Sequence, residues 1–221
     1  MPPLPTPGGS ATVRGAGLRL VALVHARDTD RLAALDPELQ AIVFREVAVV
    51  ARPAVGRPAA DEAAALAHHR DVALLARLMT VVPAPPATQF RSPAALRQWL
   101  ELHASALTEA IAHVEGRVMA RVTACRDLEG ASSDPDVLTP SAAAAESFRV
   151  LRRRAVAAVP VVGGTVGDGT TIATEAFLVE RIQWDAFAAE VVAEDERSPG
   201  LILRLTGPWP PYDFVRLQFT A

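Results

Sequence analysis

Prolines divide this chain into short elements and mark where several of them end. The sequence has 18 prolines in 221 residues, and each proline lacks the amide hydrogen that a helix interior or a central sheet ladder needs. Several of them fall at the very start, so we expect residues 1–13 to be a disordered tail without the features of a secretory signal. Pro53 and Pro58 end one predicted strand, and Pro83-Ala84-Pro85-Pro86 ends another.

The first part of the chain predicts a small sheet with helices. Residues 18–25 and 42–51 are aliphatic runs typical of strands, and residues 80–82 predict a third, shorter one. Between them, Asp61 is placed to cap a helix whose apolar stripe continues through Met79. We expect an N-terminal α+β domain over residues 14–91.

The rest of the chain predicts a longer helix followed by a regular alternation of strands and helices. Ser92-Pro93 opens the helix, and Gly116 ends it. The elements expected after it are a strand at 117–125, a loop at 129–140, a helix at 141–157, strands at 159–162 and 174–179 around a glycine-rich turn, a helix at 185–194 capped by Asp185, and a strand at 201–205. This β-α-β-β-α-β order is the ferredoxin-like split βαβ pattern. We therefore expect an α+β fold of two domains, the second spanning residues 92–221.

Composition excludes several classes of chemistry. All 22 basic residues are arginine, so the chain has no lysine for a Schiff base or for a Walker phosphate loop. The net charge is −3 with both signs interspersed, which argues against nucleic acid as a partner. No apolar run is long enough to cross a bilayer, so no membrane is expected. The single cysteine, Cys125, cannot form an internal disulfide and fits a reducing, cytoplasmic compartment.

Other candidate sites have plainer explanations. His68 and His69 point to different faces of their helix, so we expect core or surface histidines and no metal site. The glycine-rich stretch 163–169 lacks the lysine of a phosphate loop and predicts a hairpin turn. Arg152-Arg153-Arg154 is expected to stabilise a helix end, with contact to an acidic partner as the alternative.

The most specific motif lies at the end of the chain, where Leu205-Thr206 leads into Gly207-Pro208-Trp209-Pro210-Pro211-Tyr212-Asp213-Phe214. This string resembles the Leu-Thr-Gly-Pro-Trp-Pro-Pro-Tyr-x-Phe ending of the GvpF/GvpL family of gas vesicle proteins. Weaker similarity extends over about residues 18–215 and includes Val81-Val82-Pro83.

The chain departs from the family pattern at two places. Pro85, Pro86 and Ala87 stand where relatives usually carry a basic residue, phenylalanine and glycine. Met119 stands where relatives commonly carry an acidic residue.

The resemblance implies a non-enzymatic accessory protein of gas vesicle assembly, without a cofactor, located in the cytoplasm and at the vesicle. Its implied partners are the hydrophobic shell protein and other accessory proteins. A small-molecule-binding or sensory ferredoxin-like module remains an alternative, and so does an enzyme on the same scaffold.

The motif has a physical interpretation that does not depend on the family. Each proline fixes its φ and restricts the residue before it, so the segment is expected to be stiff and extended. Its aromatic side chains then project either onto the chain's own core, which we favour, or towards a partner. The candidate site residues are Gly207, Pro208, Trp209, Pro210, Pro211, Tyr212 and Phe214.

Overall fold

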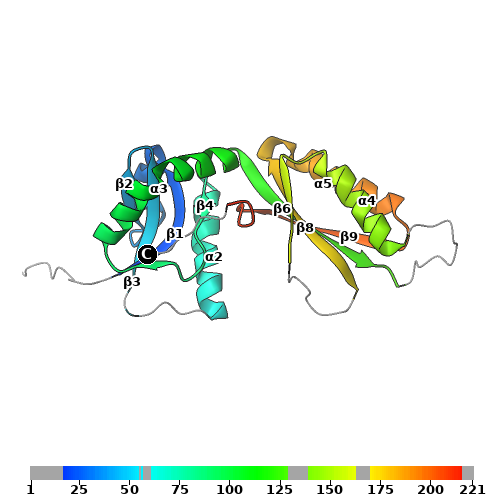
Figure 1. Cartoon of the computed structure of the whole chain (residues 1–221), viewed down its shortest axis with the longest axis horizontal. Helices are drawn as coiled ribbons and strands as arrows, with labels where there is room; N and C mark the ends of the chain where they lie inside the picture. Colours follow the sequence, from blue (N-terminus) through cyan, green and yellow to red (C-terminus); the bar gives the residue numbers. More distant parts are fainter. Residues whose placement is uncertain (1–16, 55, 57–60, 129–138, 163–169, 216–221) are drawn as a thin grey trace, which may run out of the picture.

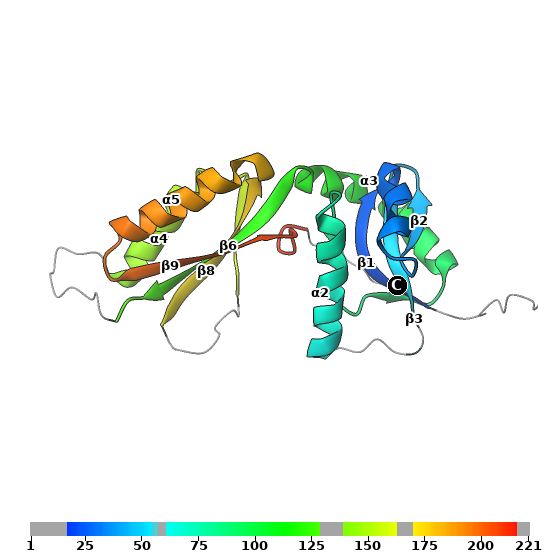
Figure 2. The same cartoon turned by 180° about the vertical axis from the view of Figure 1, so that it is seen from behind.

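The computed structural model describes residues 17–54, 56, 61–128, 139–162 and 170–215. They form two units, each built on one antiparallel sheet, arranged along the long axis of the molecule (Figures 1 and 2). The elements of the first unit are β1 (Gly17–His25), η1 (Ala26–Arg31), α1 (Leu32–Leu35), β2 (Gln40–Phe44), β3 (Val47–Ala54), α2 (Glu62–Ala76), β4 (Val82–Pro83), β5 (Gln89–Phe90) and α3 (Pro93–Val114). Those of the second are β6 (Arg117–Arg126), α4 (Pro140–Arg152), β7 (Ala157–Pro160), β8 (Thr171–Glu180), η2 (Arg181–Gln183), α5 (Trp184–Arg197) and β9 (Leu201–Trp209). The tail expected at 1–13, most of the loop expected at 129–140 and the glycine-rich turn at 163–169 lie outside the described residues.

The first unit has three layers. Its strand order is β2-β3-β1-β4, and β5 also pairs with β1. Successive residues of a strand point to opposite faces, so Leu20 of β1 packs in the core beneath α3 while Val21 packs in the core beneath α2. Both faces of this sheet are therefore covered, which explains why its central strands are almost wholly aliphatic.

The second unit has two layers and the ferredoxin-like topology. Its strand order is β7-β8-β6-β9 with every neighbouring pair antiparallel, which confirms the expected split βαβ arrangement. Helices α4 and α5 cover one face, where Phe177 of β8 packs 6.1 Å from Phe148 and 5.4 Å from Phe187 between ring centroids. The predicted two-domain α+β fold class is confirmed.

Local signals placed most helix starts correctly. The Asp61 side chain accepts a hydrogen bond from the amide of Ala64 at 2.8 Å, and the Ser92 side chain accepts one from Ala95 at 3.1 Å. The expected cap at Asp185 is wrong. Gln183 precedes the helix without a side-chain cap bond, and Asp185 lies in the first turn of α5, where a carboxylate still favours the positive end of the helix dipole.

Several element boundaries differ from the sequence prediction. The single strand expected at 42–51 is a hairpin of β2 and β3, with Arg45 at φ 53° in the turn between them. Helix α4 ends at Arg152 instead of continuing to about residue 157, since residues 157–160 join the sheet as β7. Strand β9 does not end at Leu205 but runs on to Trp209, which pairs with Met119 of β6.

Helix α3 belongs with the first sheet. Its apolar face, including Leu96, Leu100 and Leu107, packs in one core with β1 and β3. The boundary expected between residues 91 and 92 would separate this helix from the sheet that it covers. We therefore propose that the two units meet after Val114, near Gly116, whose positive φ of 72° turns the chain into β6.

Candidate functional site

The motif begins inside the second sheet. Gly207, Pro208 and Trp209 form the last residues of β9, the edge strand next to β6. Gly207 has φ 132°, and a Cβ atom there would lie 2.8 Å from the carbonyl oxygen of Met119 and 2.8 Å from the indole of Trp184. Only glycine fits this close approach without displacing backbone.

The next residues carry the chain to the first unit. Pro210 and Pro211 are buried, and the Tyr212 ring packs against the core beneath α2. Its hydroxyl lies 2.8 Å from Nδ1 of His69 on that helix, and burial raises the pKa of Tyr212 to about 12. On the other side, the carboxylate of Asp213 accepts hydrogen bonds from Arg121 of β6, the shorter at 2.8 Å. The segment 210–215 is thus held by both units, and we call it the clasp.

Trp209 is placed differently from Tyr212. Its ring meets the His69 ring edge-on with 5.7 Å between centroids, and its Nε1 donates a hydrogen bond to the Thr206 hydroxyl at 3.2 Å. The side chain remains 38% exposed. The favoured packing onto the core therefore describes Tyr212, while Trp209 is only partly covered.

A cleft of about 640 Å³ lies where the two units meet, and the motif forms one of its walls. In Figures 1 and 2 the red segment after β9 runs between α2 and the start of β6. Residues from α2 and the following turn, from the α3–β6 junction, from η2 and from the motif line it: His69, Ala73, Ala76, Arg77, Leu78, Met79, Thr80, Val81, Val114, Gly116, Arg117, Val118, Arg181, Pro208, Trp209, Pro210 and Pro211.

The charged side chains that line the cleft are all arginines. Arg117 pairs with Glu180 at 2.9 Å, so its charge is balanced. Arg77 and Arg181 are exposed, and among the described residues neither forms an ion pair. The amide of Arg181 donates to the carbonyl of Gly116 at 2.8 Å, which fixes η2 at the rim. The lining includes no aspartate or glutamate, so the cleft is positive in a chain whose net charge is −3.

The two departures from the family pattern have distinct structural settings. Pro85 to Thr88 form a turn in which the Thr88 amide donates to the Pro85 carbonyl at 3.2 Å, and Ala87 in its third position has φ 65°. A type II turn requires this left-handed conformation and favours glycine there. Met119 is 1% exposed and lies opposite Trp209, at the inner end of the motif.

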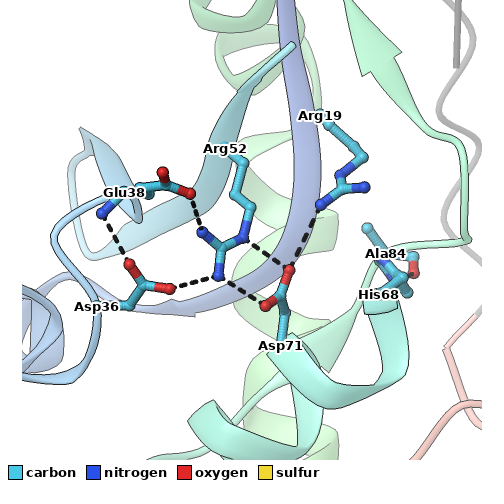
Figure 3. Close-up of polar contacts among 7 residues, drawn as sticks. All are labelled: Arg19, Asp36, Glu38, Arg52, His68, Asp71 and Ala84. Atoms are coloured by element: carbon cyan, nitrogen blue, oxygen red, sulfur yellow. Dashed lines mark hydrogen bonds and ion pairs between the residues drawn. The ribbon is translucent and has the colours of Figure 1, made fainter. Parts of the chain in front are cut away.

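A second polar cluster joins α2 to the first sheet (Figure 3). Arg52 of β3 donates two hydrogen bonds of 2.8 Å to Asp71 of α2 and contacts Asp36 and Glu38, while Arg19 lies 3.6 Å from Asp71. The amide of Glu38 and the guanidinium of Arg52 lower the pKa of Asp36. Since each of these side chains has a partner of opposite charge, we interpret the cluster as structural.

The histidine pair divides between the core and the cleft. His68 is buried with Nε2 2.8 Å from the carbonyl oxygen of Ala84, and burial lowers its pKa. His69 faces the clasp. Among the described residues, no group of three or more histidine, cysteine, aspartate or glutamate side chains is arranged to hold a metal ion.

The arginine run and Cys125 have internal roles. Arg152 donates two hydrogen bonds of 2.7 Å to the buried Glu175 of β8, and Arg154 pairs with Glu190 at 3.0 Å. Cys125 is 2% exposed on β6. No helix in the described parts of the chain has the length and hydropathy of a membrane span.

Sequence reasoning identified the motif but missed the cleft. The other walls come from α2, β6 and η2, which are far apart in the sequence and carry no shared pattern. Arg77 and Arg181 are the residues that mark the cleft, but nothing in the sequence relates them to each other. Only the fold brings them together.

The fold and this site define a two-unit α+β protein whose ferredoxin-like second unit is joined to the first by a proline-rich clasp beside an arginine-lined cleft. The sequence model of one family, described as "Gas vesicle synthesis protein GvpL/GvpF", matches residues 20–156 and 136–216. The chain belongs to the GvpL/GvpF family.

Individual relatives agree with this assignment. Gas vesicle protein F2 from Halobacterium salinarum is 41% identical over 63 residues, which cover 27% of this chain and 29% of that protein. The crystal structure of gas vesicle protein GvpF from an Anabaena species matches with a TM-score of 0.73 at 17% identity, covering 92% of this chain and 97% of that one. That of GvpF from Microcystis aeruginosa gives a TM-score of 0.70 at 14% identity, with 91% and 100% covered. At these identities the two structures establish the shared fold.

Proposed function

We propose that this protein is an accessory protein of gas vesicle assembly that works in the cytoplasm and at the vesicle by binding the shell protein, other accessory proteins, or both. Its family gives the gas vesicle role. The observation that carries the binding role is the position of the family motif: Pro208 to Pro211 form a wall of the cleft between the units.

Binding without catalysis is the role that the site supports best. Pro208 to Pro211 hold Trp209 on a backbone of restricted conformation, so contact with a partner would cost little ordering entropy. The carboxyl groups with shifted pKa values, Asp36 and Glu146, and the shifted imidazole of His68 do not line the cleft. An active site would be expected to gather such groups around its substrate.

The test is capture of purified gas vesicle components by the full chain and by Trp209→Ala. We expect the wild type to retain the shell protein or an accessory protein and the variant to lose it. Because Trp209 is partly exposed, its removal should cost about 1–2 kcal/mol of unfolding free energy, against about 3–5 kcal/mol for Trp99→Ala in the core.

Leu102→Ala is the matched control, since Leu102 is exposed on α3 away from the cleft. It should leave capture unchanged. Failure of the wild type to capture any gas vesicle component would refute the proposed function, and unchanged capture by Trp209→Ala would move the contact away from the motif.

The volume of the cleft also suits a small molecule, which keeps the ligand-binding alternative open to test. Mass spectrometry of the purified, denatured protein would reveal a bound metabolite. A stoichiometric small molecule released from the wild type, and absent from Trp209→Ala, would favour that alternative.

A further inference from the structure

We infer that the cleft binds a segment of a partner protein in which carboxylate side chains stand next to aliphatic ones. This inference rests on the proposed function and adds to it the chemistry of the partner. The occupant follows from two properties of the cleft lining, its charge and its exposed apolar surface.

The charge of the cleft selects an anionic occupant. Arg77 at the end of α2 and Arg181 at the start of η2 both line the cleft and have no ion-pair partner among the described residues. Other arginines of the described residues form internal ion pairs, among them Arg52, Arg117 and Arg152. Two arginines that line one cleft, one from each unit, suit carboxylates because the guanidinium group matches the geometry of a carboxylate.

Arg77 has one internal role that must be separated from binding. It is the C-cap of α2, where a cation also complements the negative end of the helix dipole. Arg181 belongs to a 3-10 helix of three residues and lines the same cleft. Each unit therefore contributes one arginine without an ion-pair partner among the described residues.

The apolar surface indicates that the occupant is a peptide segment and not a free anion. Leu78 is 49% exposed and lines the cleft, and so does Trp209, which is 38% exposed. A segment with alternating acidic and aliphatic side chains would satisfy the arginines and cover these surfaces together.

The experiment uses the full chain in two arms. The first repeats the capture of gas vesicle components with Arg77→Glu/Arg181→Glu and with Arg97→Glu/Arg126→Glu, which changes net charge equally at exposed arginines outside the cleft. The second measures fluorescence anisotropy with two short synthetic peptides of equal length, one alternating leucine with glutamate and the other leucine with lysine.

We expect the cleft variant to lose capture by about tenfold or more while the control pair retains it. The glutamate peptide should bind the wild type, release as salt rises, and fail to bind the cleft variant, and the lysine peptide should not bind. The control variant should match the wild type in melting temperature, whereas the cleft variant should melt somewhat lower because Arg77 complements the dipole of α2. Both arms are run well below these melting temperatures, which excludes unfolding as the cause.

Failure of this inference and failure of the proposed function give different results. Capture that survives Arg77→Glu/Arg181→Glu would overturn this inference and leave the proposed function standing. A wild type that captures nothing would refute the proposed function, and the peptides would then decide: preference for glutamate supports the acidic-segment site, and no preference overturns it.

Discussion

At the scale of single residues, Ala87 occupies a backbone conformation that favours glycine. Its φ of 65° follows from its place in the turn at residues 85–88, and side chains carrying a Cβ are strained there. This backbone geometry would account for the glycine that the resemblance implies at this position. The turn lies outside the cleft lining, so the departure bears on the stability of the turn and not on the cleft.

We predict that Ala87→Gly raises the free energy of unfolding by about 0.5–1 kcal/mol, because relief of the left-handed strain exceeds the entropy that glycine adds to the unfolded chain. Urea titration measures it. Ala106→Gly, at an exposed position inside α3, should instead lower stability by about 0.5–1 kcal/mol. A loss of stability in Ala87→Gly would contradict the strain argument.

His68 predicts a pH dependence. Burial lowers its folded-state pKa below the usual 6.5, so between the two values the unfolded state binds a proton that the folded state does not. Its contribution to stability is complete above about pH 6.5 and is lost as the pH falls through the folded-state pKa. The lowered carboxyl pKa values of Asp36 and Glu146 act only at more acidic pH, below 3.8 and 4.5 respectively.

His68→Gln keeps a donor for the carbonyl of Ala84 and removes the titrating group. We expect the decrease in melting temperature between about pH 7 and pH 5 to be smaller in this variant than in the wild type. His113→Gln, at an exposed site, should follow the wild type. Identical pH profiles for wild type and His68→Gln would show that the buried imidazole is not the source.

At the scale of elements, the Arg52 cluster fixes α2 on the first sheet. Asp71 accepts both hydrogen bonds from Arg52 and is 13% exposed, whereas Glu38 in the same cluster is 78% exposed. We expect Asp71→Asn to lower the unfolding free energy by about 2 kcal/mol. Glu38→Gln should cost less than about 0.5 kcal/mol. Equal losses of unfolding free energy in urea titrations of the two variants would mean that burial does not determine how much each contact contributes to stability.

Elements were predictable from sequence where local chemistry decides them. Asp61 and Ser92 predicted the starts of α2 and α3. The order of strands and helices in the second unit predicted its ferredoxin-like topology. The β2–β3 hairpin was missed because its turn holds Arg45 and Glu46 in place of the usual Asn-Gly pair, and the chain contains no asparagine. The Arg45 guanidinium lies 5.3 Å from the Phe44 ring centroid, a cation–π contact that favours this turn.

At the scale of the whole molecule, the clasp couples two units that have separate cores. Tyr212 contacts His69 of the first unit and Asp213 contacts Arg121 of the second. Neither contact was predictable, because the motif string specifies a stiff backbone but not what lies opposite it. The cleft depends on this coupling, since both units supply its walls.

We predict that the wild type unfolds in a single calorimetric transition and that Tyr212→Ala separates it into two, because units joined by a small interface unfold independently once the contact is lost. Tyr212→Phe retains the packed ring and should lose only about 1 kcal/mol with its hydrogen bond. A single, equally sharp transition in Tyr212→Ala would show that other contacts couple the units.

The burial of Cys125 has a practical consequence. Cys125 lies on β6 and is 2% exposed, so its thiol is shielded from solvent. It is the only cysteine of the sequence, which also has no lysine whose amine would compete for a dye. A cysteine introduced at the exposed Val192 of α5 would therefore accept a thiol-reactive dye almost alone, and a second one at Leu102 would complete a donor–acceptor pair across the molecule. The native composition thus makes this protein a ready subject for single-molecule measurements of how the two units move when a partner arrives.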